Sequence, residues 1–224
     1  HITLDEGVLN KNSKIHVKID EKKRIATARN HSATHLLQKA LREVLGSHIE
    51  QAGSYVDENR LRFDFSHFEA VSEAELCEVE KKVNEAILAA YPIDIKVMPV
   101  NEAKKLGAMA LFGEKYGENV RVVNMGGYSI EFCGGCHLKN TSEAGLFKIL
   151  SEGGVAAGVR RIEAVTGNGV LEYIAERNEI IEETAKTIKS TAAELAHKAA
   201  ALVENLAQTQ KKLWMPDASQ MPKS

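Results

Sequence analysis

The sequence predicts an α+β protein in which a largely antiparallel sheet packs with helices, followed by a long helix or a helical hairpin. Three observations support this fold class. Short segments of alternating apolar and polar residues, typical of half-buried strands, lie among longer segments with apolar residues at helical spacing. They do not follow the strict strand–helix alternation of a parallel sheet. The composition, 44% hydrophobic and 27% charged over 224 residues, suits a globular protein with a sizeable core.

The first elements are expected near the N-terminus. Residues 14–19 (KIHVKI) alternate apolar and polar side chains and predict a half-buried strand. Residues 24–28 are expected to pair back on it after a polar turn. Asn30 is a suitable N-cap for a helix over about 31–45, which Gly46 ends.

A hairpin and a second amphipathic helix follow. Residues 53–57 and 60–65 predict the two strands of the hairpin, because their alternate apolar residues fall on one face. Ser72 and Glu75 have the spacing of a capping box and begin a helix that Pro92 ends.

The remainder of this mixed region is predicted to contain five strands and one short helix. Two of the strands are joined through Gly126-Gly127, which is typical of a tight turn. The strands are expected at 93–98, 120–125, 128–132, 145–151 and 159–165, and the short helix near 101–106.

The composition changes at about residue 168, beyond which alanine, glutamate and lysine dominate. Apolar residues within 170–206 sit close to a seven-residue pattern, which predicts one long helix or a helical hairpin with any break near Ser190-Thr191. We therefore expect a domain at 1–167, a helical linker at 168–213 and a disordered tail at 214–224.

Bulk charge and cysteine content exclude several classes of protein. A net charge of −2 does not indicate a strongly basic nucleic-acid binder, so any RNA contact must come from local basic patches. No apolar run of about 18 residues predicts a membrane span, and no signal peptide follows His1, so we expect no membrane partner and interpret the chain as a fragment. Cys77, Cys133 and Cys136 are too few for a disulfide framework, which favours a reducing, cytoplasmic setting.

Two pairs of potential metal ligands stand out. His31 and His35 lie four residues apart on a predicted helix, so both imidazoles share one face. Cys133 and His137 are also four apart, where a predicted strand enters a glycine turn. One thiolate with three imidazoles suits a small tetrahedral cation. The sequence therefore predicts one zinc ion bound by these four residues.

The same residues are also compatible with purely structural roles. A lone H-x-x-x-H pair is weak evidence of metal binding, and the second segment can be a tight turn with a buried cysteine and a capping histidine. The amides around Gly134 and Gly135 are candidates to stabilise a developing oxyanion, but the glycines can equally serve only to shape the turn. Cys136 can compete as a ligand, although a packed or partly exposed thiol is favoured.

Four segments resemble the editing domain of alanyl-tRNA synthetases. They are HSATHLLQKALREVLGSHIEQAGSYV (31–56), RLRFDFSH (60–67), EFCGGCH (131–137) and GVRRIEAVTG (158–167). The resemblance spans about 10–167 and implies the fold of the threonyl/alanyl-tRNA synthetase second additional domain, a type also found in free-standing alanyl-tRNA editing proteins. The helical segment after 168 favours the full synthetase. One departure is Cys136, where the family usually has threonine.

The resemblance implies hydrolysis of the ester in tRNA(Ala) mischarged with serine or glycine. An apolar alanine pocket discriminates poorly against these amino acids, so a second, hydrolytic site must supply accuracy. Gln51 is by resemblance the residue that recognises the substrate hydroxyl; without the family it is a solvated loop glutamine. His48 and His67 are candidate acid–base groups, although each is more often structural. The full-length enzyme would use ATP to ligate alanine to tRNA(Ala), but the domain for that reaction is absent from this fragment.

Candidates for tRNA contact come from local basic residues. Arg160 and Arg161 follow a glycine-rich stretch and suit phosphate contact, although alternating strand geometry directs one of them into the body. Lys104-Lys105 and Lys22-Lys23 are weaker candidates, because such pairs usually form a solvated face.

Two other functions remain open on the sequence alone. The first is a zinc-dependent hydrolase of another substrate, including a free-standing deacylase, for which the discriminator is whether hydrolysis requires tRNA. The second is a non-catalytic tRNA-binding module in which zinc only stabilises the fold and residues 170–206 mediate self-association.

In an editing domain, zinc is expected mainly to orient the substrate or the attacking water, because four protein ligands close a zinc site.

Overall fold

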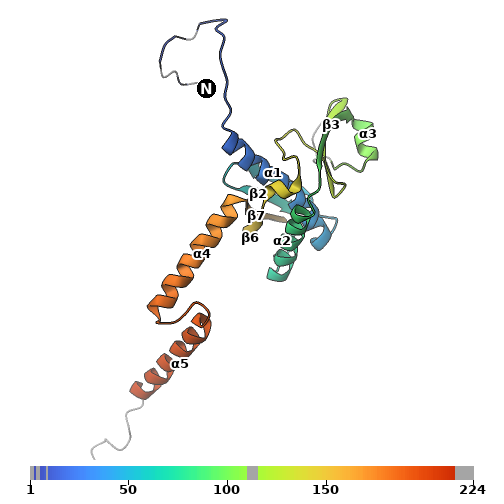
Figure 1. Cartoon of the computed structure of the whole chain (residues 1–224). Coiled ribbons are helices and arrows are strands. Elements are labelled where there is room, and N and C mark those ends of the chain that lie inside the picture. Colours follow the sequence, from blue (N-terminus) through green and yellow to red (C-terminus); the bar gives the residue numbers. More distant parts are fainter. Residues whose placement is uncertain (1–2, 4–5, 9, 110–115, 215–224) are drawn as a thin grey trace, which may run out of the picture. The chain divides into compact units, whose positions relative to one another are not determined.

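The chain folds into two compact units, His1–Gly169 and Val170–Ser224 (Figure 1). The computed structural model describes residues 3, 6–8, 10–109 and 116–214. None of the described helices is long and apolar enough to cross a membrane.

The first unit combines helices with two antiparallel sheets. The larger sheet has the strand order β1-β2-β7-β6 and the smaller one β3-β4-β5. This architecture confirms the predicted α+β class. The strands are β1 (Gln51–Val56), β2 (Leu61–Ser66), β3 (Ile93–Pro99), β4 (Asn119–Met125), β5 (Ser129–Phe132), β6 (Phe147–Ala156) and β7 (Val159–Thr166). The helices are α1 (Glu21–Leu45), α2 (Glu73–Leu88), α3 (Val100–Lys105) and the 3-10 helix η1 (Thr141–Ala144).

Helix α1 begins about ten residues earlier than predicted. Its N-cap is Asp20, whose side chain accepts hydrogen bonds from the backbone amides of Lys22 (3.0 Å) and Lys23 (3.1 Å). Residues 24–28 are therefore helical, and the predicted strand pairing is wrong. Without that partner, residues 14–19 form no strand within the described chain, and their apolar side chains are exposed.

Asn30, predicted to cap α1, instead lies buried inside the helix. Its side-chain amide donates to the Asp57 carbonyl (2.9 Å), and its side-chain oxygen accepts from the Thr166 hydroxyl (2.7 Å). Because its nitrogen and its oxygen are both hydrogen-bonded, the buried Asn30 side chain connects α1 to the hairpin loop and to the end of β7.

The hairpin and the second helix agree with the sequence. β1 and β2 pair from Gln51 opposite Phe65 to Val56 opposite Leu61. The capping box at the start of α2 is complete, with Ser72 and Glu75 bonded reciprocally.

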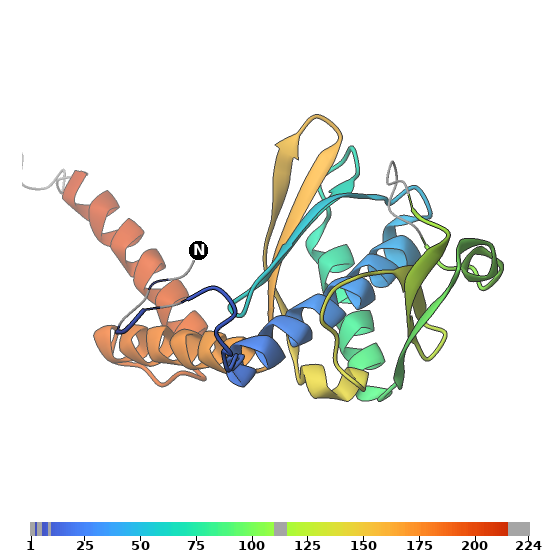
Figure 2. The ribbon, with the colours of Figure 1, turned by 90° about the horizontal axis from the view of Figure 1, so that it is seen from above.

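The core of this unit lies between α1, α2 and the larger sheet (Figure 2). α1 contributes Leu36, Leu37 and Leu41, and β2 contributes Phe63 and Phe65, all fully buried. Because side chains four apart share a helix face, burial of this apolar stripe sets the rotation of α1 about its axis and thereby directs its two histidines.

The second unit contains α4 (Asn168–Thr187, reaching back into the first unit by two residues) and α5 (Leu195–Trp214). The break between them includes Ser190-Thr191, as predicted, and α4 ends where Lys189 adopts a left-handed conformation with φ 54°. Of the predicted disordered tail at 214–224, Trp214 is instead the last residue of α5, and residues 215–224 lie outside the described residues.

Phe63 and Phe68 offer a matched test of this core. Phe63 is fully buried, whereas Phe68 is 91% exposed. We expect Phe63→Ala to lower the free energy of unfolding by about 3–5 kcal/mol, because it removes apolar burial and leaves a cavity. Phe68→Ala is expected to change it by less than about 0.5 kcal/mol. Chemical denaturation followed by circular dichroism measures both, and equal losses would contradict this description of the core.

Candidate metal centre

His31, His35, Cys133 and His137 converge on one point, and their ligand atoms all lie within 4.8 Å of one another. The two helix histidines come from α1, and the other two residues from the turn after β5. Cys133 Sγ lies 3.4 Å from His31 Nε2 and 3.2 Å from His137 Nε2. The arrangement can hold a metal ion, as the spacing of the two pairs predicted.

The second nitrogens of two imidazoles have polar neighbours behind the cluster. His137 Nδ1 lies 3.2 Å from the Ser32 hydroxyl, which also accepts a hydrogen bond from the Leu138 amide (3.2 Å). His35 Nδ1 lies 3.3 Å from Glu131 Oε2 but is not aligned to bond it, so this buried nitrogen has no hydrogen-bond partner in the described structure. Such partners orient metal-binding histidines and fix which nitrogen faces the ion.

Burial governs the electrostatics of the cluster. It lowers the pKa of His137 to about 3, with further lowering by His31 and Arg121, and it lowers the pKa of His35 well below its ordinary value. The imidazoles are therefore neutral, the form that binds metals. Burial also raises the pKa of the Cys133 thiol and raises that of Glu131 to about 8. A bound cation would supply the positive charge that a buried thiolate needs.

Arg121, on β4, holds the turn that carries Cys133 and His137. It was not identified from the sequence. Its Nη1 donates to the carbonyls of Cys133 (2.6 Å) and Gly135 (2.9 Å). The sequence signal that could have identified Arg121 is its position as the single cation among the apolar residues of the predicted strand 120–125.

The two turn glycines differ in their surroundings. The Gly135 amide donates to Cys133 Sγ (3.4 Å), and a Cβ atom added at Gly135 would overlap the His31 imidazole. Gly134 has open space at the same position. Close approach of the backbone to His31 thus requires glycine at 135 but not at 134. Cys136 is exposed and is not a member of the four-residue cluster.

Gln51 and the two arginines make contacts of their own. The Gln51 amide donates to the Ser54 hydroxyl (3.1 Å) at the start of β1. Both arginines form two-pronged ion pairs, Arg160 with Glu152 (2.6 and 2.7 Å) and Arg161 with Asp64 (2.7 and 2.8 Å). Among the described residues, no hydrogen bond joins any of the three to the metal ligands.

His48 and His67 form a separate pair on the surface. His48 Nε2 lies 2.9 Å from His67 Nδ1, and the rings stack with centroids 5.2 Å apart. Neither belongs to the metal cluster.

Comparison with known proteins identifies similar chains. The model of the threonyl and alanyl tRNA synthetase second additional domain matches residues 120–163. The chain is 56% identical over 201 residues to an alanine–tRNA ligase of Clostridioides difficile, covering 90% of this chain and 23% of that protein. It is 50% identical over 210 residues to one of Acetivibrio thermocellus (94% and 24%) and 49% identical over 208 residues to one of Bacillus subtilis (93% and 24%). The chain thus spans about a quarter of these curated relatives, and the resemblance to alanyl-tRNA synthetases is confirmed.

The two glycines provide a test of the centre. We expect Gly135→Ala to weaken the binding of zinc, used as the probe cation, by about 10–100-fold. The added methyl group would displace the His31 imidazole, and disturbing the orientation of a histidine ligand has an effect of this size. Gly134→Ala, with the same chemistry and open space, should bind as the unmodified chain does. Competition with a chromophoric chelator measures both affinities. Equal affinities for the two variants would contradict the assigned close approach to His31.

Proposed function

We propose that this chain is the editing part of an alanine–tRNA ligase. Most of its length aligns with about a quarter of the length of such a ligase, and residues 120–163 match the second additional domain of threonyl and alanyl tRNA synthetases. It would hydrolyse the ester of Ser-tRNA(Ala) or Gly-tRNA(Ala). The observation that carries the proposal is the cluster of His31, His35, Cys133 and His137, of which His35 is buried and the other three are partly buried. The full-length ligase would join alanine to tRNA(Ala) with ATP.

Zinc is the metal that best fits this cluster. Three neutral imidazoles and one thiol are borderline and soft donors, whereas magnesium and calcium prefer oxygen ligands. The unbonded, buried His35 Nδ1 facing Glu131 supports the fit, since ligation by the other nitrogen leaves that N–H for the carboxylate. When bound, zinc would supply a positive charge that polarises an ester carbonyl or a water molecule.

Four protein ligands restrict what the metal can do, because closed zinc sites are usually structural. Substrate recognition would therefore fall to other groups of the chain. The Gln51 amide is used by Ser54, which leaves its carbonyl oxygen to accept a hydrogen bond from the hydroxyl of a misattached serine. The Gly135 amide is turned toward Cys133, so Gly134 is the better candidate to stabilise an oxyanion.

The remaining parts of the proposal concern partners and location. The partner is tRNA(Ala), and a tRNA substrate together with three free cysteines favours the cytoplasm. The second unit exposes Leu171, Ile174 and Ile181 on α4 and Leu202 and Leu206 on α5, which supports self-association through 170–206.

A second candidate function follows from the closed coordination. A zinc-stabilised tRNA-binding module without hydrolytic activity would need the same four ligands. The two candidates predict different results when zinc is removed. If the chain unfolds and never hydrolysed aminoacyl-tRNA, the non-catalytic module is favoured. If the zinc-loaded chain hydrolyses aminoacyl-tRNA and loses this activity with the metal, editing is favoured.

The deciding experiment is a deacylation assay with Ser-, Gly- and Ala-tRNA(Ala), with and without a chelator. We expect hydrolysis of the first two, little of the third, and loss of activity on chelation. Cys133→Ala should lose both zinc and hydrolysis, because it removes a ligand, while Cys136→Ala, its neighbour outside the cluster, should keep both. Metal content by atomic spectroscopy accompanies each assay. Full hydrolysis and full zinc content in Cys133→Ala would overturn the assignment.

Gln51→Leu tests recognition of the serine hydroxyl. Loss of one hydrogen bond should lower kcat/KM for Ser-tRNA(Ala) about tenfold. The value for Gly-tRNA(Ala), which has no hydroxyl, should stay unchanged. Gln208→Leu, at an exposed position of α5, is the control. An equal loss with both substrates would show that Gln51 acts on something other than the hydroxyl.

A further inference from the structure

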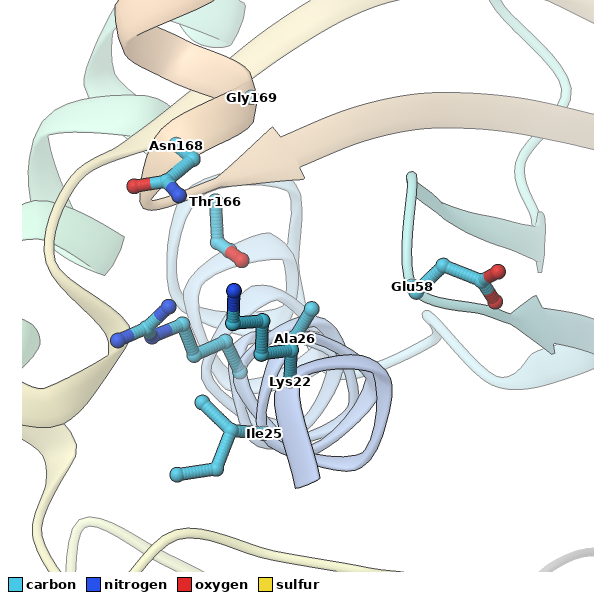
Figure 3. A pocket seen from close by; sticks show the side chains of 8 residues that line it. Lys22, Ile25, Ala26, Glu58, Thr166, Asn168 and Gly169 are labelled. Atoms are coloured by element: carbon cyan, nitrogen blue, oxygen red, sulfur yellow. The ribbon is translucent and has the colours of Figure 1, made fainter. Parts of the chain in front are cut away.

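A cavity lies in the first unit, between the start of α1 and the end of β7 (Figure 3). Its volume is about 350 Å³. Lys22, Ile25 and Arg29 line it from α1, and Thr166 and Asn168 from the end of β7 and the residues that follow. None of these residues belongs to the metal centre.

The charges at this cavity are not balanced. Within the described chain, neither Lys22 nor Arg29 forms an ion pair. The one carboxylate at the rim, Glu58, is bonded to a different cation, Lys23, at 2.9 Å. Figure 3 shows the Lys22 side chain extending toward Thr166 and Asn168 while the Glu58 carboxylate points away from it. The cavity therefore holds two cations whose charge no side chain of the described chain neutralises.

The position of Arg29 is fixed by the backbone around it. Its Nε donates to the Glu143 carbonyl (2.8 Å), while its two terminal amino groups form no hydrogen bond with the described residues. Gly167 has φ +52°, and a Cβ atom there would lie 3.3 Å from Arg29 Cδ. The glycine thus lets the arginine stem pass close to the chain, and the free end of the guanidinium is held at the cavity without a partner.

We propose that this cavity binds a phosphate group of the tRNA backbone. The planar fork of Arg29 matches two phosphate oxygens, and Lys22 adds a mobile point charge. The inference rests on the proposed function, which supplies the polyanion. Arg160 and Arg161 would have to leave their carboxylates before contacting phosphate, whereas Lys22 and Arg29 are available at once.

A polymer is favoured over a small phosphorylated ligand by the residues that precede α1. Lys14 and Lys18 are exposed and have no ion pair within the described chain, so further unpaired cations continue from the cavity along the sequence. Successive phosphates need such a series of positive charges, whereas a single phosphate needs only the cavity.

The test uses the full zinc-loaded chain and uncharged tRNA(Ala), with affinity measured by fluorescence anisotropy over a series of salt concentrations. We expect Lys22→Gln to lower the affinity about five- to tenfold at moderate salt and to lower the slope of log affinity against log salt by about 0.7–0.9. Arg29→Gln should act similarly. Lys22→Gln keeps the test valid if Arg29→Gln fails to fold, because the Lys22 side chain makes no bond within the described chain. Lys96→Gln, at an exposed position of β3 where the lysine forms no ion pair with the described residues, is the matched single-charge control and should change neither quantity.

Three results would overturn the proposal. The first is wild-type affinity and salt slope in both Lys22→Gln and Arg29→Gln. The second is an equal loss in the Lys96→Gln control, which would indicate general charge attraction. The third arises in a parallel titration with inorganic phosphate: if phosphate raises the Tm of the unmodified chain but not of Lys22→Gln, while tRNA affinity is equal for both, the cavity belongs to a small ligand. An unmodified chain that binds no tRNA would instead overturn the proposed function itself.

Discussion

The rotational setting of α1 is the constraint on which the rest of the structure depends. One face of this helix carries Leu36, Leu37 and Leu41 into the core, and His31 and His35 lie on the side toward the turn after β5. A helix cannot rotate to improve one face without displacing the other. The apolar burial that stabilises the domain therefore also directs the imidazoles, and packing sets the geometry of these candidate ligands.

The turn that carries Cys133 and His137 is held in place by several independent contacts. Arg121 donates hydrogen bonds to two of its carbonyls. The Ser32 hydroxyl accepts a hydrogen bond from the Leu138 amide and contacts His137. Gly135 has no side chain, which leaves room for the His31 imidazole. Bringing three imidazoles and a thiol together out of water is unfavourable for every charged form, as the lowered histidine pKa values and the raised thiol pKa indicate. A bound cation would relieve the cost of that burial, because metal binding favours the deprotonated thiol and the neutral imidazoles.

Local signals predicted much of this molecule, and tertiary partners explain what they missed. The capping box of Ser72 and Glu75 and the ligand spacing of His31 and His35 act within one or two helical turns, so the sequence alone reveals them. The start of α1 was missed because Asp20 and Asn30 are both good caps, and only the contacts of Asn30 with Asp57 and Thr166, distant in sequence, explain its place inside the helix. The partner of Arg161 is Asp64, on a neighbouring strand whose register the sequence does not reveal.

These ion pairs change how RNA contact is inferred from such a chain. Arg160 and Arg161 were predicted to bind phosphate because they follow a glycine-rich stretch. Each guanidinium instead forms a two-pronged ion pair with a carboxylate on a neighbouring strand. A phosphate would therefore have to displace that carboxylate. A polyanion gains most from those cations whose charge no neighbouring carboxylate neutralises. One requirement of a binding cation is then the absence of an internal carboxylate partner, which is a property of the folded chain. Lys22 and Arg29 meet this criterion in the described structure, although their sequence surroundings attract less attention than the GVRRIEA segment.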